Sequence, residues 1–394
     1  MLTFRELRTG LGRVEGRMFK MNQAKLWRRI TRRSAFAVAA VLLCCGIVAA
    51  PASAQEKVRW KVPLAFPSTL PALGDTSAWV FGTLSTASGG NIQLKIYEPG
   101  KLVPPFQIME AVKDKKVEAG FTWIGYDRGK IPALPLISAV PFGMEPWEFM
   151  AWWYHGGGSA LGEELYAPHN VHPILCGITS PETAGWFRKE IKTLDDLKGL
   201  KIRFAGLGGE VLQKLGASVT EIPGGEIYQA LEKGAIDASE FSLPEVDQQL
   251  GFHQVAKFNY FPGWHQTFTT MHLIVNKQIW DALDEQSQAL INMACMAGTT
   301  YGLSKAEANQ GKVVAGFKDI GVTPVILPDE ILVQLEKVTA EVLEEQAAKD
   351  EMFSKILQSQ TDFRKSYQLW KQYGYLPRDF QNSLVGTTDE PSQQ

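Results

Sequence analysis

The sequence has few cysteines for its length, four in 394 residues, and two of them, Cys44 and Cys45, lie in a short apolar run near the N-terminus. So small a number excludes a fold that depends on a framework of several disulfide bonds. Cys176 and Cys295 remain. They either pair in an oxidising compartment or lie in the core as small hydrophobic residues, and their wide separation in the sequence favours the second interpretation.

Beyond residue 54 the sequence also lacks long apolar runs and an excess of basic residues. No stretch of 18 residues there is continuously apolar, so we expect no membrane-spanning helix in that part. Residues 1–54 hold ten of the 40 basic and two of the 42 acidic residues, so 30 and 40 remain beyond them and the net charge there is −10. An acidic chain without a basic run argues against nucleic acid as a partner.

Motifs that would indicate catalysis are missing. The Gly206–Gly209 run follows a predicted strand, but Val211 breaks the glycine spacing of a dinucleotide-binding turn. His169 and His172 lie in a loop near proline without a helical register, and no Walker loop or zinc signature occurs. The run Gly156–Ser159 does not match a nucleophile elbow. Nothing in these patterns therefore favours an enzyme.

The N-terminal 54 residues have the three parts of a secretory signal. A basic stretch leads into the apolar run 35–50, and Ala52-Ser53-Ala54 has the small-x-small pattern of a cleavage site. We expect cleavage after Ala54 and a protein that works outside the cytoplasm. The run is shorter than the ~20 residues that a membrane anchor needs. Met21 is a second possible start, and Arg32-Arg33 gives a loose match to twin-arginine export.

Strands and helices alternate in the sequence that follows. Val58, Trp60, Val62 and Leu64 alternate with polar residues as in a strand, residues 71–88 predict a helix, and 92–96 predict a second strand. This order is typical of an α/β fold with a mostly parallel sheet.

One helix-to-strand segment occurs twice. Residues 107–120 align without a gap on residues 226–239, an offset of 119, and each copy predicts a short amphipathic helix that leads into a strand. A chance match of this length is an alternative, because the pattern itself restricts the apolar positions. Two similar α/β lobes would leave such a repeat, and a cleft between lobes is a favoured place for a ligand.

From Pro328 the apolar residues recur at three and four, which predicts about 45 residues of amphipathic helix in two or more pieces that end near Gly374. The segment 328–373 is longer than a helix that only covers the sheet of one lobe needs to be. It could latch the two lobes together, exchange into a partner chain, or pack on its own lobe.

Several motifs are more specific than composition explains. They are GWFRKEI at 185–191, LDDLKGLKIR at 194–203, IDASEF at 236–241, PGWH at 262–265, PFG at 141–143 and WYHGGG at 153–158. With them the chain resembles the periplasmic solute-binding proteins of tripartite ATP-independent (TRAP) transporters, and among them the branch that binds α-keto acids and related monocarboxylates. The resemblance covers essentially all of the chain beyond the signal.

The resemblance implies a two-lobe α/β binding protein of the periplasm that captures a small carboxylate and delivers it to the membrane subunits of an ion-driven permease. It assigns the substrate carboxylate to Arg203, and a guanidinium offers a fork of two donors that matches a carboxylate. Tyr126 is implied as an aromatic that faces the substrate, and Trp186 and Phe241 as walls of the site. A C-terminal helix exchanged in a homodimer is also implied.

The same branch holds a cation, Na⁺ or Ca²⁺, against the substrate. The implied ligands are Glu182, Glu240, the backbone carbonyl of Phe241, and Gln266, all oxygen donors as a hard cation prefers. The family pattern has Gln at the position of Glu182 and Glu at that of Gln266, so the two residues have changed places here, and Phe241 replaces a usual Trp. Glu182 is thus expected to contact the substrate as well as the cation.

We expect residues 1–54 to be the signal peptide, 55–178 the first part of lobe I with returns after about residue 242, and 179–241 the core of lobe II. Residues 242–327 would hold the hinge crossings and remaining lobe elements, and 328–380 the C-terminal helices. The rival interpretation is an exported enzyme that acts on a carboxylate with a metal as Lewis acid, Glu182 or Glu240 as base, and His265 as its one candidate histidine.

Overall fold

The computed structural model describes residues 57–378, and the predicted signal segment 1–54 lies outside them. In the described part, β1 (Val58–Pro63) pairs in parallel with β2 (Ile92–Tyr97), and α2 (Gly74–Ala87) connects them. The predicted strand–helix–strand unit is therefore confirmed. The helix begins at Gly74 rather than at residue 71 because Ala72 has a φ of 58°, which a right-handed helix does not allow.

A second sheet lies beside this pair. It has the order β3 (Ala119–Thr122), β10 (Thr270–Asn276), β4 (Val171–Ile178), with β10 antiparallel to both neighbours. Every residue of β10 is buried, as expected for a central strand. A bridge between Leu64 and Phe121 joins the end of β1 to β3, so the two sheets belong to one lobe.

The second lobe is built on a six-stranded mixed sheet. Its order is β11 (Thr323–Ile326), β9 (Phe258–Phe261), β5 (Gly185–Phe187), β8 (Ala238–Ser239), β6 (Lys201–Arg203) and β7 (Ser218–Thr220). Its neighbouring helices are α6 (Gly206–Lys214), α7 (Gly224–Glu232), α8 (Pro244–Gln249) and α9 (Phe252–Val255).

The repeated segment forms the same unit in both lobes. In the first copy, α3 (Ile108–Lys113) leads into β3, and in the second copy α7 leads into β8. The strands belong to different sheets. The prediction of a helix that runs into a strand is confirmed at both places.

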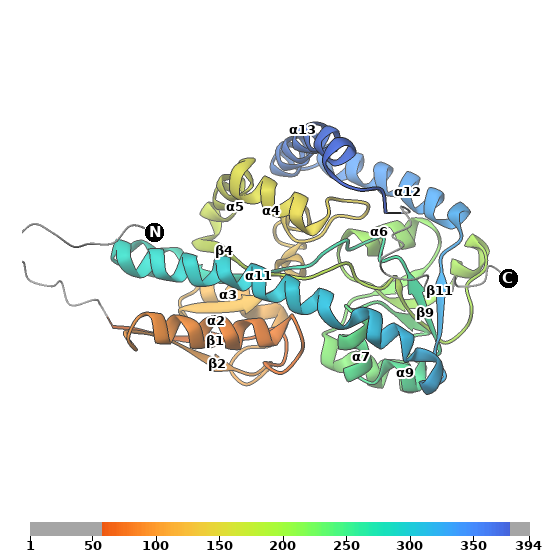
Figure 1. The fold of residues 1–394 in the computed structure, drawn as a ribbon, viewed down its shortest axis with the longest axis horizontal. Helices are drawn as coiled ribbons and strands as arrows, with labels where there is room; N and C mark the ends of the chain where they lie inside the picture. Colours follow the sequence, from red (N-terminus) through yellow and green to blue (C-terminus); the bar gives the residue numbers. More distant parts are fainter. Residues whose placement is uncertain (1–56, 379–394) are drawn as a thin grey trace, which may run out of the picture. The chain divides into compact units, whose positions relative to one another are not determined.

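Long segments tie the two lobes together. Helix α11 (Glu285–Ala315) follows α10 (Lys277–Asp281) and runs along both lobes (Figure 1), in contact with α2 and β4 on one side and α8 on the other. Asp284 caps its first turn by accepting a hydrogen bond from the Ser287 N–H. Cys176 on β4 and Cys295 on α11 form a disulfide. Pairing was the less favoured sequence interpretation, and the spatial contact of β4 with α11 is what makes it possible.

The C-terminal segment forms two helices, as predicted, α12 (Asp329–Ala347) and α13 (Glu351–Gly374). Helix α12 packs on α6 of the second lobe, whereas α13 packs on α4 (Pro146–His155) and α5 (Gly158–Tyr166) of the first. Trp152 Nε1 donates to Ser359 Oγ at 3.1 Å across the latter contact. Of the three roles open for this segment, the latch across both lobes fits this packing (Figure 1).

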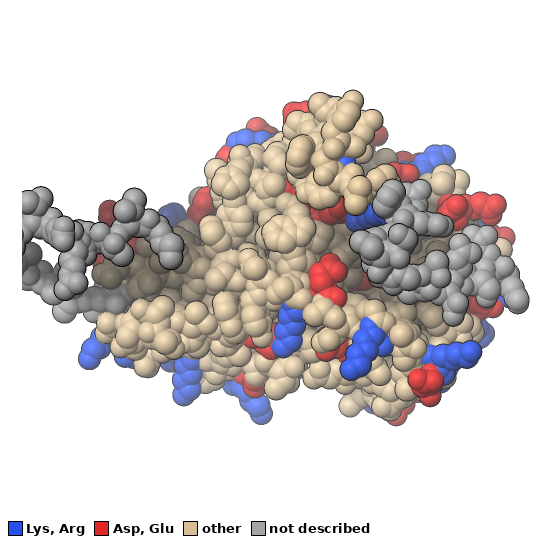
Figure 2. Space-filling view, in the orientation of Figure 1, with Lys and Arg blue, Asp and Glu red and all other residues tan. Residues whose placement is uncertain are grey.

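Short 3-10 helices complete the chain, at Pro105–Gln107, Ile124–Asp127, Leu134–Ile137, Ala167–His169, Leu194–Leu197 and Phe317–Ile320. None of the helices within residues 57–378 combines the length and the apolar character that a membrane crossing requires. On the face drawn in Figure 2, basic and acidic side chains are scattered and do not gather into one patch.

Candidate functional site

Loops from both lobes meet around a cavity of about 270 Å³, a volume that includes space open to solvent. From the first lobe come the loop after β1 and the segment that follows β3. From the second come the ends of β6 and β8 and the loops between the sheets. The lining residues are Phe66, Leu73, Trp123, Tyr126, Glu182, Arg203, Ala205, Glu240, Phe241, Gln266 and Thr269.

Arg203 is the positive group of the cavity. It is the last residue of β6, and its side chain is only 2% exposed. Nη1 donates to Glu240 Oε1 at 2.6 Å and to the Glu240 carbonyl oxygen at 2.8 Å, and Nε donates to the Ile222 carbonyl oxygen at 3.3 Å. Within residues 57–378, Nη2 has no hydrogen-bond partner. These contacts hold the guanidinium in place and leave donors of Nη2 for a ligand.

Glu240 is the counter-ion of Arg203. Its Oε1 also accepts a hydrogen bond from the Ala205 N–H at 2.6 Å, whereas Oε2 has no hydrogen-bond partner within residues 57–378. Burial opposes ionisation of this carboxyl, but Arg203 and the other donors outweigh it and hold the pKa of Glu240 below its ordinary value. Glu240 is thus an anion with one oxygen that is free to bind a cation.

Glu182 is a second buried carboxyl, from the connection between β4 and β5. Burial raises the pKa of Glu182 well above its ordinary value, and the negative charge of Glu240 raises it further. The Thr269 hydroxyl donates to Glu182 Oε1 at 2.6 Å. Two neighbouring carboxyls with opposite pKa shifts are typical of a site that requires a proton or a cation between them.

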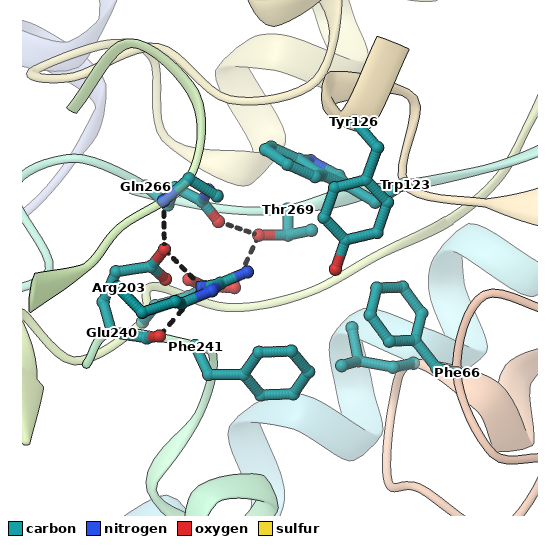
Figure 3. A pocket seen from close by; sticks show the side chains of 11 residues that line it. Phe66, Trp123, Tyr126, Arg203, Glu240, Phe241, Gln266 and Thr269 are labelled. Carbon is teal, nitrogen blue, oxygen red and sulfur yellow. Dashed lines mark hydrogen bonds and ion pairs between the residues drawn. The ribbon is translucent and has the colours of Figure 1, made fainter. Parts of the chain in front are cut away.

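The amide of Gln266 has one orientation that satisfies its neighbours. Thr269 Oγ1 lies 2.8 Å from it and has one hydrogen, which the shorter contact with Glu182 already uses. With the amide nitrogen turned toward Thr269 and Glu182, Gln266 donates to Thr269 Oγ1 and to Glu182 Oε2, each at 2.8 Å. The opposite orientation directs the amide oxygen toward these carboxyl and hydroxyl groups (Figure 3).

His265 lies against both carboxyls. Nε2 is 3.5 Å from Glu240 Oε2 and 3.7 Å from Glu182 Oε2, and neither ring nitrogen has a hydrogen-bond partner within the described chain. One potential ligand atom each from Glu182, Glu240 and His265 lie within 4.8 Å of one another.

This donor set fits a cation. Two buried carboxyls converge, one with an orphaned oxygen, and the Phe241 carbonyl oxygen accepts no hydrogen bond within residues 57–378. A turn of the Gln266 amide out of the orientation that satisfies Thr269 and Glu182 would present its oxygen to the same carboxyls. Carboxylate and carbonyl oxygens suit a hard cation such as Na⁺ or Ca²⁺.

A glycine makes this convergence possible. A Cβ on Gly263 would lie 2.2 Å from the carbonyl oxygen of Glu182, so no other residue fits without moving that backbone. The neighbouring peptide bond, Phe261–Pro262, is cis. The sequence PGWH therefore places His265 and Gln266 beside Glu182 through a close backbone contact.

Aromatic rings close the remaining sides. The Tyr126 hydroxyl points into the space in front of Arg203 (Figure 3), and burial raises the pKa of this phenol, so it stays a neutral donor. The Tyr126 ring contacts Trp123 edge-on at 4.9 Å and Phe66 at 6.0 Å between centroids. The guanidinium of Arg203 lies 5.5 Å from the centroid of the Phe241 ring. Trp123 Nε1 has no hydrogen-bond partner among the described residues.

Most of the residues singled out from the sequence meet here. Arg203, Glu182, Glu240, Phe241, Gln266 and Tyr126 all line the cavity.

Trp186 does not line the cavity, although we expected it to wall the site. It lies in the core of the second lobe, where Nε1 donates to Asp247 Oδ2 at 2.8 Å and the ring meets Phe317 edge-on. Burial raises the pKa of Asp247 to about 8.

Phe66, Trp123 and Thr269 were missed. They come from distant loops, and no local pattern marks them, since an aromatic or a threonine near a strand end is common in any α/β fold. His169 ends a 3-10 helix, and His172 lies on β4 rather than in the predicted loop. The His172 side chain is half-buried, with Nδ1 2.8 Å from Glu163 Oε1 and the ring stacked on Trp280, away from the cavity.

Comparison with known proteins identifies the family of this chain. Residues 76–350 match the family described as Bacterial extracellular solute-binding protein, family 7. A Monocarboxylate 2-oxoacid-binding periplasmic protein of Nostoc sp. is 35% identical over 319 residues, which are 81% of this chain and 87% of the relative. Its relatives are solute-binding proteins and not enzymes, so the rival interpretation as an enzyme is set aside.

Two solved structures are similar to this chain both in fold and in sequence. A TRAP solute-binding protein of Bordetella bronchiseptica, a mixed-occupancy dimer with copurified calcium and picolinate, has a TM-score of 0.79 at 31% identity, covering 81% of this chain and 95% of its own. A TRAP solute-binding protein of Pseudoalteromonas atlantica with bound sodium and pyruvate has a TM-score of 0.78 at 32% identity, covering 81% and 97%. The chain therefore belongs to family 7 of the bacterial extracellular solute-binding proteins, the DctP family of TRAP solute receptors.

Proposed function

We propose that this protein captures a small monocarboxylate of the 2-oxo acid class, with a Na⁺ or Ca²⁺ ion, and delivers it to the membrane subunits of a TRAP transporter. The observation that carries the proposal is the buried guanidinium of Arg203, whose Nη1 is held by Glu240 and whose Nη2 has no hydrogen-bond partner within residues 57–378. A substrate carboxylate would accept from Nη2 and from the Tyr126 hydroxyl. The Nostoc relative's name and the ligands of the two structures support this ligand class.

In this proposal the cation lies between Glu182, Glu240, the Phe241 carbonyl and Gln266. It offsets the repulsion between Glu182 and the substrate carboxylate, which the positive charge of Arg203 alone does not cancel. The 2-oxo group and one carboxylate oxygen of the substrate would complete the shell of oxygen ligands. A ligand that contacts both lobes favours the closed form by its differential affinity for that form.

The lobe boundaries belong to the same proposal. We assign residues 55–178 and the return after about residue 242 to lobe I, 179–241 to the core of lobe II, and the region up to 327 to crossings and remaining lobe elements. The separation of the three-stranded sheet, to which β10 returns beside β3 and β4, from the six-stranded sheet supports this division.

Binding measurements test the proposal. Isothermal titration of the purified protein with pyruvate is expected to give saturable binding in Na⁺ or Ca²⁺ that weakens in chelator and sodium-free buffer. Arg203→Lys is expected to weaken binding by tenfold or more, since an ammonium cannot supply the planar fork. Arg188→Lys, at an exposed position, is the matched control. Unchanged binding in Arg203→Lys would contradict the assignment.

We further propose that the protein is exported to the periplasm with residues 1–54 removed. Fractionation of the native cells and N-terminal sequencing of the mature protein test this proposal, with Gln55 expected as the first residue. A mature protein that retains residues 35–50 would contradict it.

A homodimer through the C-terminal helix is the last part of the proposal. Helix α13 and the residues after it expose Leu369, Trp370, Tyr373 and Leu376, each at least 59% exposed. Trp370→Glu is expected to shift the mass measured by light scattering toward the monomer, and Leu102→Glu, on another exposed loop, is the control. A monomer in the unmodified protein would contradict this part.

A further inference from the structure

Asp247 is a buried carboxyl that the proposed function does not use. It lies on α8, is fully buried, and does not line the cavity around Arg203. Oδ2 accepts a hydrogen bond from Trp186 Nε1 at 2.8 Å, and Oδ1 accepts one from the Ser242 N–H at 3.1 Å. Both carboxylate oxygens are thus engaged by N–H groups of the second lobe. Within the described chain, Asp247 is not one of the groups that converge on the cation position.

The Ser242 N–H belongs to the same peptide group as the Phe241 carbonyl. Among the described residues the one cis peptide bond is Phe261–Pro262, so the Phe241–Ser242 bond is trans. A trans peptide is planar, and its N–H and C=O point in opposite directions. Because the N–H faces Asp247, the Phe241 carbonyl faces away from Asp247, and it accepts no hydrogen bond within residues 57–378. Asp247 therefore fixes the direction of a carbonyl oxygen that is available to a ligand.

Further hydrogen bonds connect this peptide to the other segments of the cation position. The Thr183 N–H donates to the Ser242 carbonyl oxygen at 3.2 Å. The Glu182 N–H in turn donates to the Gln266 carbonyl oxygen at 3.2 Å. The backbone at residues 182, 242 and 266 is thus joined by hydrogen bonds, and the Asp247 carboxylate holds the side of Ser242 that these backbone contacts leave open.

Trp186 holds Asp247 in this orientation. It is the middle residue of β5, it is fully buried, and its ring meets Phe317 edge-on with centroids 5.5 Å apart. The indole Nε1 carries a single hydrogen, which it donates to Asp247 Oδ2. Rotation of the Asp247 carboxylate would leave this buried N–H without an acceptor, which costs free energy.

We propose that Asp247 is a positioning residue of the cation site. Held by Trp186, it orients the Phe241–Ser242 peptide so that the Phe241 carbonyl oxygen is presented to the cation. This inference rests on the proposed function, because it takes that carbonyl as a cation ligand. Substitution of groups that orient metal ligands typically lowers metal affinity by about 10–100-fold. Trp186 then acts on the site through Asp247 and not as a wall of the cavity.

Asp247→Asn and a compensating double variant test the inference. An amide has one acceptor oxygen and an NH₂ group that only donates, so the N–H groups of Trp186 and Ser242 compete for one oxygen. We expect the affinity for Ca²⁺ at saturating pyruvate to fall at least about tenfold in Asp247→Asn. Trp186→Phe/Asp247→Asn removes the competing donor and leaves the amide oxygen to the Ser242 N–H. It is expected to recover most of the lost affinity, whereas a purely structural role predicts that two changes in the core are worse than one.

Glu148→Gln is the matched control. Glu148 is a buried carboxyl of α4 in the first lobe, where its Oε2 accepts a hydrogen bond from the Glu145 N–H at 3.4 Å. Its loss is expected to leave the Ca²⁺ affinity unchanged. Urea unfolding of all the variants separates a loss of affinity from a loss of stability.

The coordination of a bound ion gives a spectroscopic readout. Tb³⁺ replaces Ca²⁺ in oxygen sites, and its luminescence lifetimes in H₂O and D₂O count the water molecules that it binds. A carbonyl that leaves the coordination shell is replaced by water, so we expect about one additional bound water in Asp247→Asn and no additional water in the double variant.

Hydrogen exchange provides a readout that needs no cation. In chelator, peptides that contain Ser242 are expected to exchange their amide hydrogens faster in Asp247→Asn than in the unmodified protein. The double variant should restore the slow exchange, because the amide oxygen of Asn accepts the Ser242 N–H once Trp186 no longer competes for it.

The outcomes separate this inference from the function on which it rests. An Asp247→Asn variant with the Ca²⁺ affinity and bound-water count of the unmodified protein overturns the role of Asp247 and leaves the receptor function intact. If Asp247→Asn does not fold, Trp186→Phe carries the test, and unchanged Ca²⁺ affinity and exchange at Ser242 in that variant overturn the inference. If the unmodified protein binds no pyruvate with any cation, the proposed function fails and the inference fails with it.

Discussion

Arg203 and Glu240 form a buried ion pair in which one guanidinium nitrogen, Nη1, is held by both the carboxylate and the backbone carbonyl of the same residue, at 2.6 and 2.8 Å. Both side chains are at most 2% exposed. One partner without the other would be an uncompensated charge in a medium of low dielectric constant. The pair therefore couples ligand recognition to the stability of the second lobe.

The first prediction follows from this pair. Arg203→Ala leaves the Glu240 anion unpaired and is expected to lower the free energy of unfolding by about 3–5 kcal/mol. The double variant Arg203→Met/Glu240→Gln removes both charges, keeps an acceptor for the Ala205 N–H, and is expected to recover most of that loss. Both should lack carboxylate binding. Urea unfolding measures the difference, and equal stability of the two variants would contradict the prediction.

The exchange of Glu182 and Gln266 that the family resemblance implies gives a second prediction. Glu182→Gln removes one of two carboxyls that converge on the cation position, so the affinity for Ca²⁺ in the presence of ligand is expected to fall at least about tenfold. Glu182→Gln/Gln266→Glu restores the number of carboxyls, with the order reversed, and should bind Ca²⁺ within about tenfold of the unmodified protein. Titration with Ca²⁺ at saturating pyruvate makes the comparison. Equally weak Ca²⁺ binding in the single and double variants would contradict the prediction. It would show that the position of each carboxyl, and not their number, determines the affinity for Ca²⁺.

A third prediction concerns pH. Burial raises the pKa of Asp127 from 3.8 to about 6, against the opposing effect of Lys130. Between these values the folded state binds more protons than the unfolded state, so the stability that this group contributes falls as pH rises from about 4 to 6. Asn cannot ionise. Asp127→Asn is therefore expected to be similar to the unmodified protein at pH 4 and more stable above pH 6, by up to about 3 kcal/mol.

Asp196 supplies the opposite control. The backbone N–H groups of Lys192 and Thr193 and the Thr193 hydroxyl donate to its carboxylate and lower its pKa. Its stabilisation is present at neutral pH and is lost as pH falls through the lowered pKa. Asp196→Asn should thus be less stable than the unmodified protein at pH 7, with the difference closing in acid. Urea unfolding of both variants from pH 3 to 8 provides the test, and curves that run parallel to that of the unmodified protein would refute the assignment.

The sequence predicted those parts of the molecule that local pattern controls. Apolar alternation identified β1, and spacing at three and four identified α12 and α13. Trp186 shows where local pattern fails. Trp123 follows β3 and Trp186 is the middle residue of β5, and both are buried. Only the packing of the two lobes decides that Trp123 lines the cavity while Trp186 pairs with Asp247.

The same limit applies to contacts between distant segments. Thr269 is adjacent to Glu182 only because β10 returns to the sheet of β3 and β4, and the sequence between them has no signal of that contact. The amide orientation of Gln266 likewise depends on the single hydroxyl hydrogen of Thr269. Arg203 could be predicted as a residue of the site because the motif LKGLKIR is specific to the family. Secondary-structure propensities alone do not contain that information.

The disulfide between Cys176 and Cys295 gives the last prediction. It joins β4 to α11 across a sequence separation of 119, and both residues are fully buried. In the chain-entropy account a loop of this length contributes about 5 kcal/mol by restricting the unfolded state. Cys176→Ala/Cys295→Ala, which leaves no buried hydroxyl unpaired, is expected to lower the free energy of unfolding by about that amount. Pyruvate affinity should stay within about twofold, because neither cysteine lines the cavity around Arg203. Reduction of the unmodified protein before urea unfolding should reproduce the loss. An unfolding midpoint that neither reduction nor the double variant changes would contradict a structural role for the bond.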